Sequence, residues 1–424
     1  MSALKDKFAS QIPGIRDELK AIAKDHADHK ISDVSVAQAY GGMRGVKGMI
    51  CDTSVVDPAK GLIIRGRPIL DLTDKIPEEI FFLLLTGDLP TDAELKDLQN
   101  EYKKRAEVPD YVWKVLEAMP KDSHPMCMLD TAVLVLEKES KFRQKYTEGI
   151  PKTDYWDPAL EDSLDLLAKL PGLAAGVYRM RYDKGPRIPY DPNLDWGANY
   201  AHMLGNDSED FYKAMRLYLT LHCDHEGGNV SANTCHTVGS ALSDVYYAVS
   251  AGLNGLAGPL HGLANQECLG WILEVVKEFG GVPTDDQLKD YAWKTLNSGK
   301  VIPGYGHAVL RCPDPRFVAF VNFGAEYCKD DDVYQTVKKV FDLIPGVLKE
   351  HGKAKNPQPN VDAGSGSILY HFGLTEFPYY TVLFAVSRTM GMCSQLVLNR
   401  AMGTAITRPK SVSTEWIKKE VGMA

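Results

Sequence analysis

The stretch LFAVSRTMGMCSQLV, residues 383–397, decides the fold class. Its apolar side chains recur at spacings of three and four, the period of one helix face: Leu383, Val386, Met390, Cys393 and Val397. The same period runs through 210–222, 263–279 and 333–344, where Pro345 is expected to disturb the last helix. Strands do not alternate with helices, which disfavours a parallel α/β sheet. We therefore expect an all-α fold.

One short segment departs from this helical pattern. Apolar runs at 49–51 and 62–64 flank Asp57-Pro58-Ala59-Lys60-Gly61, a sequence rich in typical turn residues. Two apolar runs joined by a turn predict a small β-hairpin within residues 48–66.

Clusters of Gly and Pro divide the chain. They lie around residues 252–262 and 371–378, on either side of a mainly helical stretch. We therefore expect a large helical domain of residues 1–261 plus 371–424, and a smaller helical domain of residues 262–370 inserted into it. A site between two such domains is a common place for a ligand.

Composition limits the class of protein. The 424 residues are 44% hydrophobic and 25% charged, which is ordinary for a soluble globular protein with a large core. The net charge of −8 disfavours binding to nucleic acid or to anionic membranes. The eight cysteines are scattered without a Cys-x-x-Cys pair, which is typical of reduced thiols inside a cell.

Three segments place a proton-transferring side chain beside Gly or Pro. His and Asp are common catalytic acids and bases, and Gly lets a ligand approach the backbone closely. Each segment alone also fits a plainer role: a turn at His261, a bare loop at His307, or a helix N-cap at Asp362. Together they predict an acid/base site. The segments are Gly258-Pro259-Leu260-His261-Gly262, Pro303-Gly304-Tyr305-Gly306-His307 and Asn360-Val361-Asp362-Ala363.

His261 is expected to be neutral. It precedes an apolar periodic segment, which places it near a helix N-terminus. There the helix dipole favours imidazole over imidazolium. A neutral imidazole can donate a hydrogen bond to a developing oxyanion.

Three arginines and one further histidine suggest a site for a dicarboxylate. Arg388 interrupts an apolar helix, where a guanidinium is costly unless it is paired or binds an anion. Arg316 follows Asp-Pro and Arg408 precedes a Pro, and guanidinium groups bind carboxylates in a bidentate manner. His225 precedes Gly227-Gly228 at a predicted helix end, which favours a role as a substrate-binding donor.

A metal site is the alternative interpretation of one cluster. The spacing matches no standard zinc pattern, and we expect no metal there. The cluster comprises His222, Cys223, Asp224, His225, Cys235 and His236.

In their order and spacing, these segments resemble the citrate synthase family in its long, eukaryote-like form. The resemblance runs from Tyr40-Gly41-Gly42-Met43-Arg44-Gly45 to Arg408-Pro409-Lys410-Ser411 and includes 222–229, 255–265 and 301–316. It implies a homodimeric, two-domain helical enzyme that condenses acetyl-CoA with oxaloacetate and water. Citrate and CoA would form through an enol(ate) and citryl-CoA, without a further cofactor or a metal, as the opening step of the tricarboxylic acid cycle.

The resemblance also implies roles for single residues. Asp362 would remove a methyl proton from acetyl-CoA, His261 would bind the thioester carbonyl, and His307 would polarise the ketone of oxaloacetate. Oxaloacetate and citrate would be bound by His225, Arg316, Arg388 and, from the partner subunit, Arg408. The CoA-binding positions would be Arg44, Val301, Pro303, Gly304, Tyr305, Gly306, Arg311 and Lys355. Gly364 and Cys312 depart from the pattern that the resemblance leads us to expect.

Two alternatives remain open at this stage. A 2-methylcitrate synthase would use propionyl-CoA, and one methylene changes discrimination by only about 1–3 kcal/mol. A non-catalytic scaffold or metal-binding protein would use the cluster at 222–236. The N-terminus shows neither a signal core nor a transit peptide. We therefore expect a cytoplasmic, bacterial-type protein, with the mitochondrial matrix as the alternative for a processed chain.

Overall fold

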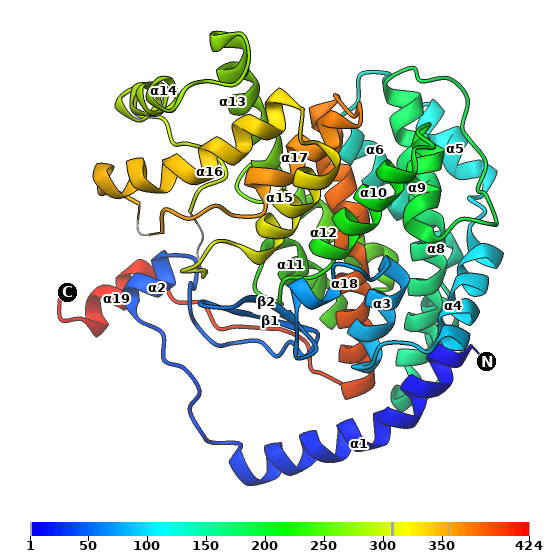
Figure 1. Cartoon of the computed structure of the whole chain (residues 1–424). Helices are drawn as coiled ribbons and strands as arrows, with labels where there is room; N and C mark the ends of the chain where they lie inside the picture. Colours follow the sequence, from blue (N-terminus) through cyan, green and yellow to red (C-terminus); the bar gives the residue numbers. More distant parts are fainter. Residues whose placement is uncertain (1, 307–308, 355, 424) are drawn as a thin grey trace.

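Helices form most of the computed structural model, which describes residues 2–306, 309–354 and 356–423 (Figure 1). Short 3-10 helices lie at Ile69–Leu72 (η1), Leu136–Glu139 (η2), Lys152–Asp154 (η3) and Phe377–Tyr379 (η4). The α-helices are α1 (Ala3–His26), α2 (Val36–Tyr40), α3 (Pro77–Thr86), α4 (Asp92–Arg105), α5 (Asp110–Glu117), α6 (Pro125–Val135), α7 (Lys141–Thr147), α8 (Trp156–Arg181), α9 (Trp196–Leu204), α10 (Glu209–His222), α11 (Val230–Ser240), α12 (Val245–Leu256), α13 (Ala264–Phe279), α14 (Asp285–Asn297), α15 (Pro315–Tyr327), α16 (Asp332–His351), α17 (Asp362–His371), α18 (Tyr380–Met402) and α19 (Thr414–Glu420).

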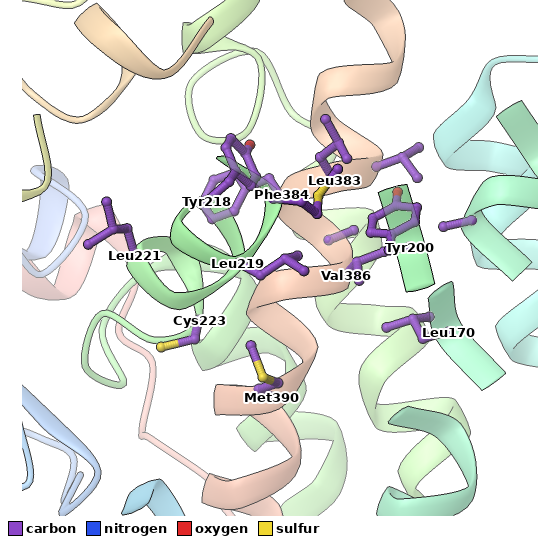
Figure 2. Packing of buried hydrophobic residues seen from close by; sticks show 14 of the residues in the cluster. Leu170, Tyr200, Tyr218, Leu219, Leu221, Cys223, Leu383, Phe384, Val386 and Met390 are labelled. Atoms are coloured by element: carbon purple, nitrogen blue, oxygen red, sulfur yellow. The ribbon is translucent and has the colours of Figure 1, made fainter. Parts of the chain in front are cut away.

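Helix α18 is the centre of the core. Almost every residue along it is buried, and it packs against α8, α10, α11 and α12. Figure 2 shows its residues Leu383, Phe384 and Val386 among side chains such as Tyr218 and Tyr200. Full burial of one such apolar side chain stabilises the fold by about 1.5–3 kcal/mol. The periodic segment at 383–397 is therefore helical and buried, as predicted.

The same helix passes a length and composition test for a membrane span. The most apolar 18-residue window within Phe377–Met402 has a mean hydropathy of 1.3, and 94% of that window is buried inside the protein. A mainly apolar helix that is buried on all sides is also typical of the core of a large protein. Its apolar surface is thus already covered by neighbouring helices.

The predicted β-hairpin is present but shorter than expected. Strands β1 (Ser54–Asp57) and β2 (Gly61–Ile64) pair antiparallel, and the short strand β3 (Arg67–Pro68) extends the sheet. Asp57 Oδ1 accepts hydrogen bonds from the N–H groups of Ala59 (2.8 Å) and Lys60 (2.9 Å), which closes the turn. The apolar run 49–51 forms no strand, and Ile50 is 62% exposed.

The other helix predictions hold, with one correction. Helix α10 coincides with 210–222, and α13 ends at Gly280 in a left-handed conformation, as the stop signal predicts. Helix α16 continues through Pro345 to His351, so the interruption expected there is wrong. Val340, Ile344 and Val347 are buried around the proline. Burial of these apolar side chains offsets the roughly 3 kcal/mol cost of an internal proline.

Helices α13 to α17 form a group of their own. They pack mainly on one another and lie together in Figure 1, where they run from green (α13) to orange (α17). Their contact with the rest of the chain includes α15 against η1 and β2. A Cβ on Gly61 would lie 2.4 Å from the ring of Pro315, so glycine permits this close approach.

Candidate active site

The loop between α10 and α11 is held by a buried carboxylate. Asp224 accepts hydrogen bonds from the hydroxyls of Thr53 (2.5 Å) and Ser54 (2.8 Å) and from the amide of Gln395 (2.8 Å). Burial raises the pKa of Asp224, and these donors and the charge of Arg388 oppose that rise. Asp224 thus ties β1, the loop and α18 together, a role that the sequence did not reveal.

Arg388 lies next to this loop and forms no ion pair with a described carboxylate, although the charges of Asp224 and Asp362 lie near it. Its side chain is 2% exposed; Nε donates to the His222 carbonyl (3.1 Å) and Nη1 to Asn229 Oδ1 (3.1 Å). Its guanidinium also lies over the Phe384 ring, at 4.8 Å. Burial lowers the pKa of Arg388 to about 10, so the group stays positive at neutral pH. A buried cation of this kind is suited to an anionic ligand.

Arg316 is buried as well, but it has a local partner. Its Nη2 lies 2.6 Å from Asp314 Oδ2, and Nε lies 3.0 Å from Oδ1. Asp314 also caps α15 by accepting from the backbone N–H of Arg316. Because the guanidinium sits in a bidentate pair, its position is fixed before any ligand binds.

His261 lies in a tight turn between α12 and α13. The N–H of Gly262 donates to the carbonyls of Leu256 (3.0 Å) and Gly258 (3.2 Å), and a Cβ on Gly262 would lie 2.2 Å from the Leu256 oxygen. Only glycine fits at that position. His261, which directly precedes this glycine, is therefore held by the hydrogen-bonded turn rather than by a helix.

Ser231 determines which ring nitrogen of His261 carries the proton. Nε2 of His261 lies 3.3 Å from the backbone N of Ser231 and 3.0 Å from its hydroxyl oxygen. A backbone N–H can only donate, so Nε2 accepts and the proton of the neutral ring is on Nδ1. Burial, with help from Arg388, lowers the pKa of His261 to about 4. The expected neutral state thus arises from burial, since His261 precedes the first residue of α13.

Asp362 is the first residue of α17. Val361 is the N-cap residue, and the N–H of Asp362 donates to Asn360 Oδ1 (3.0 Å), so the carboxylate is not used as a cap. Burial raises its pKa to about 6; Arg316 and Arg388 oppose the rise, and Asp314 adds to it. A carboxylate with a raised pKa is a stronger base than an ordinary one.

A backbone pairing brings the 301–306 loop to Asp362. The N–H of Asn360 donates to the Gly304 carbonyl (2.9 Å), and the N–H of Gly306 donates to the Gln358 carbonyl (3.0 Å). Gly304 and Gly306 both have positive φ, at 80° and 96°. The predicted CoA segment and the predicted base are therefore neighbours. His307 and Lys355 lie outside the described residues.

Four of the other predicted ligand-binding residues are exposed. Val301 is 77% exposed, and Arg311 is exposed with its N–H donating to the Pro58 carbonyl (2.8 Å). Arg44 and Arg408 are exposed too, and no described hydrogen bond or ion pair joins either of them to the group around Asp362. His225 follows Asp224 in the loop and is half-buried.

The histidine and cysteine cluster does not form a metal centre in the described part of the chain. No group of three or more His, Cys, Asp or Glu is arranged there to hold an ion. His222 Nδ1 bonds the Tyr218 carbonyl (2.9 Å), and burial lowers the pKa of His222 to about 3. His236 bonds Thr407 (3.0 Å) and Asn399 (2.8 Å) instead.

Comparison with known proteins identifies the family. The model of the citrate synthase C-terminal domain matches residues 42–410. The chain belongs to the citrate synthase family. It is 48% identical to the mitochondrial citrate synthase of Saccharomyces cerevisiae over 428 residues, which covers 99% of this chain and 89% of that one. It is 49% identical to citrate synthase 4, mitochondrial, of Arabidopsis thaliana, covering 98% of this chain and 90% of that one.

Solved structures of citrate synthases share the fold. The enzyme from Pyrobaculum aerophilum superposes with a TM-score of 0.78 at 29% identity, covering 88% of this chain and 92% of that one. The Thermoplasma acidophilum enzyme, solved as a ternary complex with carboxymethyl coenzyme A and oxaloacetate, has a TM-score of 0.75 at 23% identity. It covers 90% of this chain and 96% of that one. The all-α fold class is confirmed.

The activity of this citrate synthase follows from the family. It condenses acetyl-CoA with oxaloacetate and water to give citrate and CoA. The expected cytoplasmic, bacterial-type location is wrong, because the similar chains are mitochondrial enzymes of yeast and plants and a peroxisomal enzyme of yeast. That expectation rested on the absence of a targeting signal, and an absence does not identify a compartment.

Proposed function

We propose that Asp362 is the base and His261 the hydrogen-bond donor that together form the enol of acetyl-CoA. The observation that carries this proposal is the contact of Ser231 N–H with His261 Nε2, which leaves the Nδ1 proton to donate. Asp362, with a pKa of about 6, takes the methyl proton while the thioester oxygen gains charge. One oriented donor at such an oxygen is worth about 100- to 1000-fold in rate.

The next steps use the second substrate. The enol carbon attacks the ketone carbon of oxaloacetate, and His307 donates to the ketone oxygen as it becomes the hydroxyl of citryl-CoA. Water then attacks the thioester carbonyl, the carbon–sulfur bond breaks, and citrate and CoA leave. His307 has this role by its position in the family pattern.

Oxaloacetate is bound by Arg388, Arg316 and His225, with Arg408 from the partner subunit. The unpaired charge of Arg388 supports its part in this set. Exposure of Arg408 in the single chain supports its use by a second subunit, and the protein is therefore a homodimer in this proposal. The neighbouring Thr407 is held in place by two contacts: its hydroxyl bonds His236, and its N–H donates to the Ser240 hydroxyl oxygen. These contacts fix the position of the chain just before Arg408.

CoA is bound by the 301–306 loop together with Arg311, Lys355 and Arg44. The exposed Val301 at the start of this loop and the basic residues suit a long ligand that carries phosphates. The ternary complex of the Thermoplasma acidophilum enzyme, with a CoA analogue and oxaloacetate, supports the same pair of ligands here.

Closure of residues 262–370 onto residues 1–261 and 371–424 completes the site. Helices α13 to α17 pack mainly on one another, which supports their movement as a unit. Closure excludes water, protects the enol and makes Asp362 more basic. We place the enzyme in the mitochondrial matrix, in line with the mitochondrial citrate synthases of yeast and plants that it resembles.

The test is CoA thiol release from acetyl-CoA, measured with and without oxaloacetate. Release that depends strictly on oxaloacetate supports the closed, two-substrate site. Release without oxaloacetate contradicts it. The same assay with propionyl-CoA gives the kcat/KM ratio that decides the 2-methylcitrate alternative, where the proposal expects acetyl-CoA to be favoured.

A further inference from the structure

Asn229 connects three parts of the site through one side-chain amide. It lies at the N-cap of α11, directly after the loop that carries His225. Its oxygen accepts from Arg388 Nη1 (3.1 Å) and from the N–H of Ala232 (3.1 Å), and it lies 2.8 Å from the Ser231 hydroxyl oxygen. Its nitrogen donates to the carbonyls of His225 (3.0 Å) and Glu226 (2.9 Å).

The two ends of this amide are not interchangeable. Two nitrogen donors face its oxygen and two carbonyls face its nitrogen, so the orientation of the amide is fixed by its partners. The Glu226 carbonyl belongs to a residue with φ of 53°, an uncommon conformation for a residue other than glycine. A donor at that carbonyl therefore helps to hold the loop in a conformation that the backbone alone disfavours.

We propose that Asn229 is a positioning residue for oxaloacetate. It orients the Arg388 guanidinium and the His225 loop with a neutral acceptor, so that the charge of Arg388 stays available for a substrate carboxylate. This inference rests on the proposed roles of Arg388 and His225. Asparagine alone among good N-cap residues offers both the acceptor and the two donors; Asp lacks the donors, and Ser lacks the reach.

Asn229→Asp is the sharpest variant. It keeps the shape and the helix cap, but it sets carboxylate oxygen against the carbonyls of His225 and Glu226. It also gives Arg388 an internal ion pair that competes with substrate. We expect oxaloacetate to bind about 10- to 100-fold more weakly, because buried acceptors lose their donors. The melting temperature should fall by only a few degrees, since Asp is an equally good N-cap while two loop carbonyls lose their donors.

Asn229→Ser is the second variant, and it adds no charge. It also keeps a cap oxygen for Ala232 but loses both donors, and we expect weaker oxaloacetate binding again. Asn100→Asp is the matched control, because Asn100 is exposed on α4 and the change in charge is the same. Oxaloacetate affinity is measured by calorimetry on the full-length protein without acetyl-CoA, and kcat, KM and melting temperature are measured in parallel.

The outcomes separate the positioning role of Asn229 from the proposed oxaloacetate-binding role of Arg388. If either folded Asn229 variant binds oxaloacetate like the wild type while Arg388→Lys binds it weakly, Asn229 has no positioning role. If Arg388→Lys also binds like the wild type, the assignment of the dicarboxylate site itself fails. A variant with a lower melting temperature and unchanged oxaloacetate affinity shows a purely structural role, which also overturns the inference.

Discussion

The backbone N–H of Ser231 lies 3.3 Å from Nε2 of His261 and so fixes the proton of the neutral ring on Nδ1. Ser231 is the second residue of α11, where a helix leaves N–H groups without an intrahelical partner. The helix end thus supplies the donor that orients the imidazole. The contact joins two residues that are thirty positions apart in the sequence.

Removing the backbone N–H of Ser231 should damage catalysis more than removing the Ser231 side chain. Ser231→Pro removes the N–H in the first helical turn, where proline is tolerated. We expect kcat to fall by about 100-fold or more, because Nδ1 is no longer held as the donor. Ser231→Ala keeps the N–H and should retain most of the activity. Equal losses in both variants would show that the hydroxyl, and not the backbone, orients His261.

Replacing the base should abolish turnover. Asp362→Ala should lower kcat by at least about 100- to 10,000-fold, while oxaloacetate still binds. Steady-state kinetics and calorimetry on the same preparation measure the two effects. A near-normal kcat in a folded variant would remove Asp362 as the base.

The rate should also depend on the protonation of Asp362. With a pKa of about 6, kcat/KM should fall as the pH drops through 6, with a limiting slope of about tenfold per pH unit. The profile is measured from pH 5 to pH 8, in a range where His261, with a pKa of about 4, stays neutral. An inflection near the ordinary carboxyl value would contradict the raised pKa.

The ionised carboxylate of Asp362 should also lower the free energy of unfolding at neutral pH. Its folded pKa of about 6 exceeds the ordinary value of 3.8, so the ionised form is disfavoured in the folded state. Its favourable contribution to folding is therefore complete below about pH 3.8 and is lost as the pH rises through 6. Asp362→Asn should raise the free energy of unfolding at pH 7.5 by about 1–3 kcal/mol. Denaturant titration at pH 7.5 and pH 4 measures the free energy of unfolding. The increase caused by Asp362→Asn should be smaller at pH 4.

The role of Arg408 across the interface can be tested by mixing inactive subunits. Asp362→Ala and Arg408→Ala chains are unfolded together and refolded, so that mixed dimers form. If each site takes Asp362 from one chain and Arg408 from the other, a mixed dimer keeps one intact site. About a quarter of the wild-type activity should return when all chains pair at random. If Arg408 acts within its own chain, no activity returns.

Removing metal should leave the enzyme unchanged. In the proposed mechanism, Arg388, Arg316 and His261 supply the charge and the donors that the reaction needs. Dialysis against a chelator should preserve kcat and KM. A loss of activity that zinc or magnesium restores would show that a metal takes part.

Much of the fold could be predicted from the sequence, because local patterns encode it. The period of three and four at 383–397 marks a helix whatever surrounds it, and Gly280 marks the end of another. Pro345 misled the prediction, because burial of neighbouring side chains outweighed a local helix breaker. Such burial depends on other helices and cannot be calculated from the segment itself.

The sequence by itself determined the helical fold, the family and the identity of Asp362, His261 and Arg388 as candidates, since these follow from residue types and spacing. The tertiary structure alone decided their chemical states. The pKa of Asp362 depends on burial and on Arg316 and Arg388, and the contact of Asn229 with Arg388 joins residues 159 positions apart. Desolvation and hydrogen bonding act over a few ångströms in space, so their effects exist only once the chain has folded.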